Sequence, residues 1–266
     1  MNVSRSDAAA GFSATADGYA ATMAPSLRVT ACEVVRRANL VPGERVLDFG
    51  TGTGIGAAEA LGQGREVIGL DKAPGMLELA RRDVPGVTFV EADFAEIPFA
   101  DAHFDVVIGV HALPFASDRV AVLHELLRVT KPGGRLSLSV PGPHDTVHPT
   151  LYAPIYARHG IQVRSDYPAL GALAAWARRA GWINVETDAD PTTAIVLADE
   201  TAFRAWLRVG SRRGTWAAWP AKRVEALAGE MLEITPRDPD GRVRIPFGTL
   251  YLRARAGSPF VGVHNS

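Results

Sequence analysis

The chain has 266 residues, of which 47% are hydrophobic and 21% charged, so it can bury the core of a large α/β domain and is not a disordered protein. Its formal net charge of −1 provides no general attraction for nucleic acid or for an anionic membrane. A single cysteine, Cys32, excludes an internal disulfide and a thiolate metal cluster, and the helical pattern around it predicts a buried, inert thiol.

The first forty residues predict a loose tail followed by helix. Residues 1–11 are rich in small side chains, and residues 12–39 follow a helical pattern with Pro25 near its start. One face of this helix is expected to carry Leu27, Val34, Val35 and Ala38. Tyr19 either covers a ligand of the loop that follows or packs at a helix junction. No stretch is typical of a signal peptide or a membrane span, so a cytoplasmic location is expected.

Residues 45–56 predict a strand that turns through glycines into a helix. The apolar run 46–49 is typical of a strand buried on both faces, and a glycine turn lets backbone N–H groups approach a ligand. Two patterns fit the loop. Gly52-x-Gly54-x-x-Ala57 satisfies the dinucleotide fingerprint, whereas Asp48-x-Gly50-x-Gly52-x-Gly54 places an acid before three alternating glycines. The loop alone does not separate them.

Strands and helices then alternate at a spacing that indicates a parallel sheet with right-handed crossovers. A strand at 66–71 ends in Asp71, where a carboxylate can accept hydrogen bonds from both ribose hydroxyls of an adenosine. The further expected elements are a helix from Pro74, strands at 87–91 and 104–110, a helix at 119–129, a turn at 131–134 and a strand at 135–140.

The C-terminal part is less regular. Helices are expected at 151–158, 169–180, 200–209 and 221–232, and strands at 182–188 and 246–256. His144 and His148 lie in a Pro-containing loop whose composition does not favour a metal site.

Several motifs follow one another in a fixed order. They are 46–54, Gly69-Leu70-Asp71 with Met76-Leu77, Ala92-Asp93 with Ile97-Pro98-Phe99, Phe104-Asp105-Val106-Val107, Glu125-Leu126-Leu127-Arg128-Val129, Lys131-Pro132-Gly133-Gly134 and Ala180-Gly181-Trp182. In this order the chain resembles the class I S-adenosylmethionine (SAM) dependent methyltransferases, and most of all the small-molecule group typified by the ubiquinone/menaquinone C-methyltransferases. Residues 1–40 and 142–179 match only loosely.

The resemblance implies a Rossmann-like, seven-stranded, mostly parallel sheet whose last strand is antiparallel, with helices on both faces and a small helical cap. It implies a single methyltransferase domain over 1–266, with an N-terminal helical cover at 1–40, a SAM-binding core at 41–141, and substrate cover and last strands at 142–266.

The resemblance also assigns the cofactor contacts. Gly50, Thr51, Gly52 and Gly54 would lie under the amino-acid and ribose portions of SAM. Asp71 would hold the ribose hydroxyls and Asp93 the adenine amino group. The remaining expected cofactor contacts are Tyr19, Asp48, Lys72, Met76, Ala92, Phe94 and Val110.

His111, at the end of the fourth strand, is the candidate general base, because strand ends of an open α/β sheet face the ligand crevice. The alternative is that it only lines the site. Relatives often carry a His pair a few residues further on, where this chain has Pro114-Phe115. The candidate substrate contacts are His144, His148, Tyr152, Trp206 and Arg212. The alternative is an amphipathic cap helix whose tryptophans belong to the core and whose arginines are solvated.

We therefore expect methyl transfer from SAM to a small-molecule acceptor. The alternatives are a SAM-binding enzyme of the same fold with cyclase or decarboxylase chemistry, a non-enzymatic SAM-binding module, and an NAD-dependent oxidoreductase. The Ala92-Asp93 pair before an Ile-Pro-Phe turn has no role in a dehydrogenase, which argues against NAD. No metal, nucleic acid or membrane partner is expected, and the oligomeric state, a homodimer included, stays open.

Overall fold

The computed structural model describes residues 8–63, 66–142, 151–161, 168–209 and 218–257, and all structural statements below concern these residues. Among their helices, none combines the length and apolarity needed to cross a bilayer.

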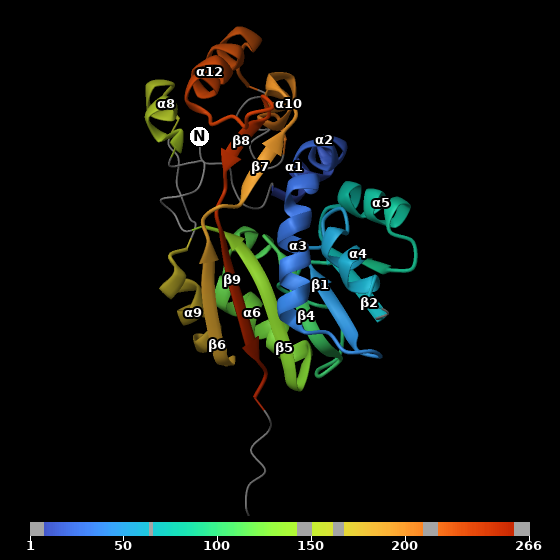
Figure 1. Cartoon of the computed structure of the whole chain (residues 1–266). Coiled ribbons are helices and arrows are strands. Elements are labelled where there is room, and N and C mark those ends of the chain that lie inside the picture. Colours follow the sequence, from blue (N-terminus) through green and yellow to red (C-terminus); the bar gives the residue numbers. More distant parts are fainter. Residues whose placement is uncertain (1–7, 64–65, 143–150, 162–167, 210–217, 258–266) are drawn as a thin grey trace, which may run out of the picture.

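A seven-stranded sheet forms the centre of the molecule (Figure 1). Its strands are β1 (Arg45–Phe49), β2 (Glu66–Asp71), β3 (Thr88–Glu91), β4 (Phe104–Val110), β5 (Thr130–Pro141), β6 (Ile183–Asp190) and β9 (Thr249–Arg255). They lie in the order β3-β2-β1-β4-β5-β9-β6, and only β9 is antiparallel to its neighbours. The strand order reverses between β1 and β4, and open α/β sheets bind ligands beyond the carboxyl ends of the strands at such a point.

Helices cover both faces of the sheet. One face carries α3 (Ala24–Ala38), α4 (Ile55–Leu61) and α5 (Pro74–Asp83), and the other carries α6 (Arg119–Val129) and α9 (Leu170–Arg179). The period of two in β1 explains this: Val46 packs in the cluster of α3 and α4, and Leu47 in the cluster of α6 and α9. Both faces of the strand are buried, as the apolar run predicts.

The N-terminal segment forms three helices, whereas a loose tail and one helical segment were expected. These are α1 (Ala8–Ala14), α2 (Ala16–Thr22) and α3, so the predicted loose tail is wrong from residue 8 onward. The start of α3 does carry Pro25, and the predicted apolar face is buried. Both α1 and α2 contact α5, beside the edge of the sheet (Figure 1).

A separate cap stands above the sheet in Figure 1. It contains α8 (Ala153–Arg158), α10 (Glu200–Trp206), α12 (Ala221–Ile234) and a two-stranded antiparallel sheet of β7 (Ala194–Leu197) and β8 (Val243–Pro246). Its own apolar core is built around Tyr152, Phe203, Leu227 and Met231. The cap has the expected helices and, in addition, the two short strands β7 and β8, which were not predicted. The predicted last strand at 246–256 corresponds to β9 in the main sheet.

The predicted turn at 131–134 is part of β5. Phe104 pairs with Thr130 and Val106 with Arg135, so these four residues are an irregular insertion in a strand that has already begun.

Two of the sequence motifs meet through hydrogen bonds. Glu125 accepts from the Ile97 N–H (2.9 Å), and Arg128 donates to the carbonyls of Ile97 (3.0 Å) and Phe99 (2.9 Å). Helix α6 therefore holds the turn that follows β3.

Candidate functional site

The glycine loop between β1 and α4 leaves its backbone open at one position. Gly50, Gly52 and Gly54 all have positive φ, the region in which side chains are strained. A Cβ at Gly50 would collide with Ala112, and one at Gly54 would lie 3.1 Å from Val84, so both are required for close packing. At Gly52 no atom lies within 4 Å of such a Cβ. A ligand can therefore approach the backbone there.

The Asp71 carboxylate lies beside this opening. Its Oδ2 accepts the Gly52 N–H (2.8 Å) and its Oδ1 accepts the Ala73 N–H (2.9 Å). Burial raises the pKa of Asp71, while these backbone bonds act in the opposite direction. The loop and the end of β2 thus hold the carboxylate in one orientation, with lone pairs left to accept from a ligand hydroxyl.

Asp48 supports the loop from beneath. It is 1% exposed, and it accepts the hydroxyl of Thr51 (2.7 Å). Burial raises the pKa of Asp48 to about 7. A Cβ at Gly56 would lie 2.9 Å from its Oδ2, so Gly56 leaves room for the acid, a role that the sequence pattern did not indicate. The side chains of Asp48 and Thr51 are thus used within the protein.

A second acid lies after β3. Lys72 Nζ donates to Asp93 Oδ2 (2.7 Å), and the Ala95 N–H donates to Oδ1 (2.9 Å). The lysine holds the pKa of Asp93 below its usual range. The Ala92 N–H donates to the Asp71 carbonyl (3.0 Å), which ties the two strand ends together.

Aromatic side chains line the two sides of this region. The Phe94 ring meets Phe49 edge to face at 6.1 Å and lies 4.0 Å from the position of a Cβ on Gly50. From the N-terminal cover, Phe12 meets Tyr19 at 5.9 Å and Phe115 at 5.0 Å. Burial and, to a smaller extent, the charge of Asp71 raise the pKa of the Tyr19 hydroxyl.

Two further predicted contacts lie around these groups. Met76 is 2% exposed and packs with Ala16 and Leu79 beneath the cover, whereas Val110 is half-buried at the end of β4. The hydroxyl of Ser13 accepts the Gly75 N–H (2.8 Å) and anchors α1 on α5. Ser13 is 62 positions from Gly75, and no sequence signal indicated this contact.

His111 follows β4 with its ring inside the protein. It has a φ of 55°, its N–H donates to the Ser139 carbonyl (3.0 Å), and its ring lies 5.1 Å from that of Phe247. Burial lowers the pKa of His111 to about 3, so the imidazole is neutral at physiological pH. Its Nδ1 has no hydrogen-bond partner among the residues that the structure describes.

Comparisons with known proteins show the family of this chain. Residues 47–138 match the methyltransferase domain family. A demethylmenaquinone methyltransferase of Renibacterium salmoninarum is 34% identical over 175 residues, which span 65% of this chain and 64% of that protein. One from Clavibacter sepedonicus is 35% identical over 170 residues, which span 55% of this chain and 68% of that protein. The chain belongs to the class I SAM-dependent methyltransferases.

Solved structures agree on the fold of this methyltransferase. A chain from the complex of the Haloferax volcanii Trm112 methyltransferase activator with a methyltransferase superposes with a TM-score of 0.61 at 23% identity, over 96% of this chain and 98% of that one.

The sequence matches cover only part of some relatives. The match spans 64% of the Renibacterium protein, which is less than two thirds, and 40% of a demethylmenaquinone methyltransferase from Beutenbergia cavernae.

The predicted substrate contacts divide into two groups. In this methyltransferase Tyr152 is fully buried in the cap core with its hydroxyl 2.7 Å from Thr235 Oγ1, and Trp206 donates its indole N–H to Met23 Sδ (3.0 Å). Tyr152 therefore belongs to the core of the cap, and Trp206 joins the cap to the N-terminal helices. His144, His148 and Arg212 lie outside the described residues.

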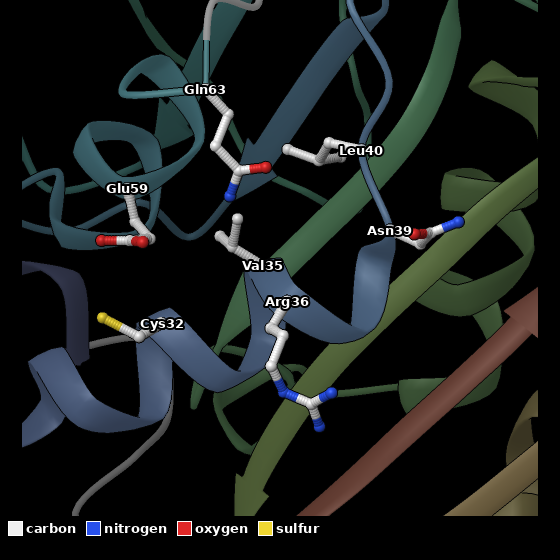
Figure 2. Close-up of a pocket in the computed structure, with 7 residues that line it drawn as sticks. All are labelled: Cys32, Val35, Arg36, Asn39, Leu40, Glu59 and Gln63. Atoms are coloured by element: carbon white, nitrogen blue, oxygen red, sulfur yellow. The ribbon is translucent and has the colours of Figure 1, made fainter.

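A pocket of about 410 Å³ lies elsewhere, between α3 and α4 (Figure 2). Its lining residues are Cys32, Val35, Arg36, Asn39, Leu40, Glu59 and Gln63. Leu40 lies shortly before β1, so the pocket is near the amino-terminal end of this strand, whereas the glycine loop follows its carboxyl end. Cys32 is exposed there, which makes the prediction of a buried thiol wrong. Partial burial and a hydrogen bond to Glu59 raise the pKa of the Cys32 thiol, which disfavours the reactive thiolate.

Proposed function

We propose that this methyltransferase transfers a methyl group from SAM to a small-molecule acceptor. The observation that carries the proposal is the open backbone at Gly52 beside the oriented Asp71 carboxylate, at the point where the strand order reverses. This arrangement has an oriented carboxylate that can accept from ribose hydroxyls, and an uncovered backbone position against which an adenosine with an amino-acid tail can lie.

The surrounding residues fit the rest of the cofactor. The Asp93 carboxylate would accept the adenine amino group, and the rings of Phe94 and Tyr19 would cover the nucleoside from two elements. Lys72 keeps Asp93 ionised and therefore able to accept. When bound, SAM supplies an electrophilic methyl group on a sulfonium.

The contribution of the protein is chiefly to position the acceptor. Displacement at a methyl group requires the acceptor atom in line with the bond that breaks, and holding it there supplies much of the acceleration. His111 and Val110 follow from β4 into this crevice. A neutral imidazole can accept a hydrogen bond from an O–H or N–H group of the molecule to be methylated. Its low pKa makes His111 a weak base.

Methyl transfer is tested directly with SAM that carries a tritiated methyl group. Because relatives are named demethylmenaquinone methyltransferases, demethylmenaquinone in its reduced form is the first acceptor to assay. The expected result is label in the product together with one S-adenosylhomocysteine for each methyl group transferred. Cofactor binding with conversion of a substrate but without transferred label would instead indicate cyclase or decarboxylase chemistry.

The Asp71→Asn substitution tests the cofactor site itself. Loss of the charged acceptor is expected to weaken S-adenosylhomocysteine binding by about 10- to 100-fold, the equivalent of one hydrogen bond to a charged group. Titration calorimetry measures the Kd. Asp83→Asn is the matched control, because Asp83 is an exposed acid at the end of α5 whose partner is Arg82. Equal Kd values for the two variants would contradict the proposed site.

A further inference from the structure

A chain of polar groups leads away from the His111 ring toward the cap. His111 Nε2 lies 3.5 Å from the Thr249 Oγ1, which lies 2.8 Å from the Thr193 Oγ1. The Thr193 Oγ1 in turn lies 3.4 Å from the Asp190 carbonyl oxygen. Thr249 is fully buried at the start of β9, and Thr193 is half-buried in the connection between β6 and β7.

The carbonyl at the end of this chain favours one direction for its hydrogen bonds. A carbonyl only accepts, so the Thr193 hydroxyl donates to Asp190 and is left as an acceptor. The Thr249 hydroxyl then donates to Thr193, and the His111 Nε2–H donates to Thr249. This order places the proton of the neutral imidazole on Nε2 and leaves a lone pair on Nδ1.

The opposite order is costly. If Thr249 donated to Nε2, the proton would lie on Nδ1, which is buried and has no partner among the described residues. An unsatisfied buried N–H costs about 1–3 kcal/mol and is rarer in proteins than an under-used acceptor. The ring of Phe247, two positions before Thr249, lies 5.1 Å from the imidazole, so the same strand connection also packs against it.

We propose that Thr249 and Thr193 are positioning residues that hold neutral His111 as its Nε2–H tautomer, so that the lone pair of the ring lies on Nδ1. Nδ1 is buried in the free protein, and it accepts a hydrogen bond from an O–H or N–H group of the methyl acceptor when the bound acceptor reaches it. This assignment rests on the proposed function and narrows its acceptor to a molecule with such a hydrogen next to the atom that is methylated. Thr193 lies between β6 and β7, and Thr249 begins β9 just after β8, so both residues lie where the chain passes between the sheet and the cap. These two connections are joined to each other, because the Thr193 carbonyl accepts the N–H groups of Phe247 (3.0 Å) and Gly248 (3.1 Å). The position of the cap is thereby linked to the tautomer of His111.

The tautomer can be read by NMR of ¹⁵N-labelled apoprotein, with His111 assigned by the His111→Gln variant. The wild type is expected to show a protonated Nε2 and an unprotonated Nδ1. In Thr193→Val the Thr249 hydroxyl loses its acceptor and turns to donate to Nε2, so the proton is expected to move to Nδ1. Thr193→Ser retains a hydroxyl and is expected to retain the wild-type tautomer.

Thr130→Val is the matched control for loss of a threonine hydroxyl. The Thr130 hydroxyl donates to the Leu126 carbonyl (2.6 Å) at the opposite end of β5, so this variant loses one buried hydrogen bond without affecting His111. In the methyl-transfer assay, Thr193→Val is expected to lower kcat/KM for the acceptor about tenfold, the equivalent of one hydrogen bond, with the KM for SAM unchanged. Thr130→Val is expected to leave both constants unchanged.

Two results would overturn the inference. One is a wild-type protein with its proton on Nδ1, and the other is a Thr193→Val variant whose tautomer and kcat/KM both equal those of Thr193→Ser. Because the tautomer is read without cofactor or acceptor, a protein that shows the expected tautomers but transfers no methyl group would refute the proposed function and leave the assignment of the hydrogen-bond chain confirmed.

Discussion

Burial disfavours the charged form of two ionisable residues of the site. Both Asp48 and His111 are more stable uncharged inside the protein, which raises the pKa of Asp48 to about 7 and lowers that of His111 to about 3. The acid supports the loop from beneath, and the histidine lies buried at the end of β4 as a neutral group. A hydrogen-bond acceptor is therefore the role that we propose for His111, and this role requires no change in its charge near neutral pH.

The buried histidine is expected to make folding stability depend on pH. In the unfolded chain its pKa is about 6.5, so below that pH the unfolded state binds a proton that the folded state does not. The stability from the neutral ring is therefore present above pH 6.5 and is lost as the pH falls toward 3. Between pH 7.5 and pH 5 the wild type should lose about 2 kcal/mol more unfolding free energy than His111→Gln.

Urea unfolding of both proteins at the two pH values measures this difference. Contributions from Asp48 and the other acids are common to both proteins and cancel in the comparison. Parallel loss of stability would mean that the His111 ring can be protonated without unfolding, and that it is not buried as described.

At the scale of elements, the position of α1 depends on a glycine in its neighbour. Gly75, near the start of α5, donates its N–H to Ser13, and a Cβ there would collide with the Ser13 carbonyl. Since α1 also carries Phe12, which meets Tyr19 edge to face, the contact with α5 fixes the position of this aromatic pair.

Gly75→Ala is expected to push α1 away from α5 and to weaken S-adenosylhomocysteine binding by roughly tenfold, because about 1.4 kcal/mol of cover contacts would be lost. Calorimetry gives the Kd. Gly171→Ala in α9 is the matched control, since no atom lies within 4 Å of its added Cβ and alanine favours a helix by up to about 1 kcal/mol. If Gly75→Ala bound as tightly as Gly171→Ala, the N-terminal helices would have no part in cofactor binding.

Some elements could be predicted to the residue because their own sequences define them. The strands β2 and β4 are continuous apolar runs that end in a polar or irregular position, and the observed bounds equal the predicted ones. The helix α6 likewise shows its full apolar face, and Asp118 caps its start by accepting the N–H groups of Val120 and Ala121.

Other features depend on partners that are distant in the sequence. The strands β7 and β8 have four residues each with alternate burial, and only their pairing with each other makes them a sheet. The bulge at 131–134 is defined by the pairing of Thr130 with Phe104. In the site, the glycines and the acids after the strands follow a motif, whereas Ser13, Thr193 and Thr249 meet their partners across 62, 56 and 138 positions.

At the scale of the whole molecule, hydrogen bonds join the cap to the N-terminal helices. Trp206 donates to Met23, and the Val196 N–H donates to the Ser26 hydroxyl (2.9 Å), so both α10 and β7 are attached to the N-terminal helices. Ion pairs such as Arg208–Glu225 are exposed and contribute little. The cap, the cover and the glycine loop consequently enclose the same end of the sheet.

This enclosure means that a ligand bound at the loop should stabilise the whole protein. At a free S-adenosylhomocysteine concentration of 100 times its Kd, mass action adds about 2.7 kcal/mol to the unfolding free energy, which for a chain of this length is a rise in Tm of roughly 5 °C. NAD at the same concentration is expected to leave the Tm unchanged, because it lacks the amino-acid tail and carries a second nucleotide. Differential scanning calorimetry separates the two ligands, and Asp71→Asn should lose the response. A rise in Tm with NAD alone would instead assign the glycine loop to the dinucleotide pattern that its spacing also satisfies.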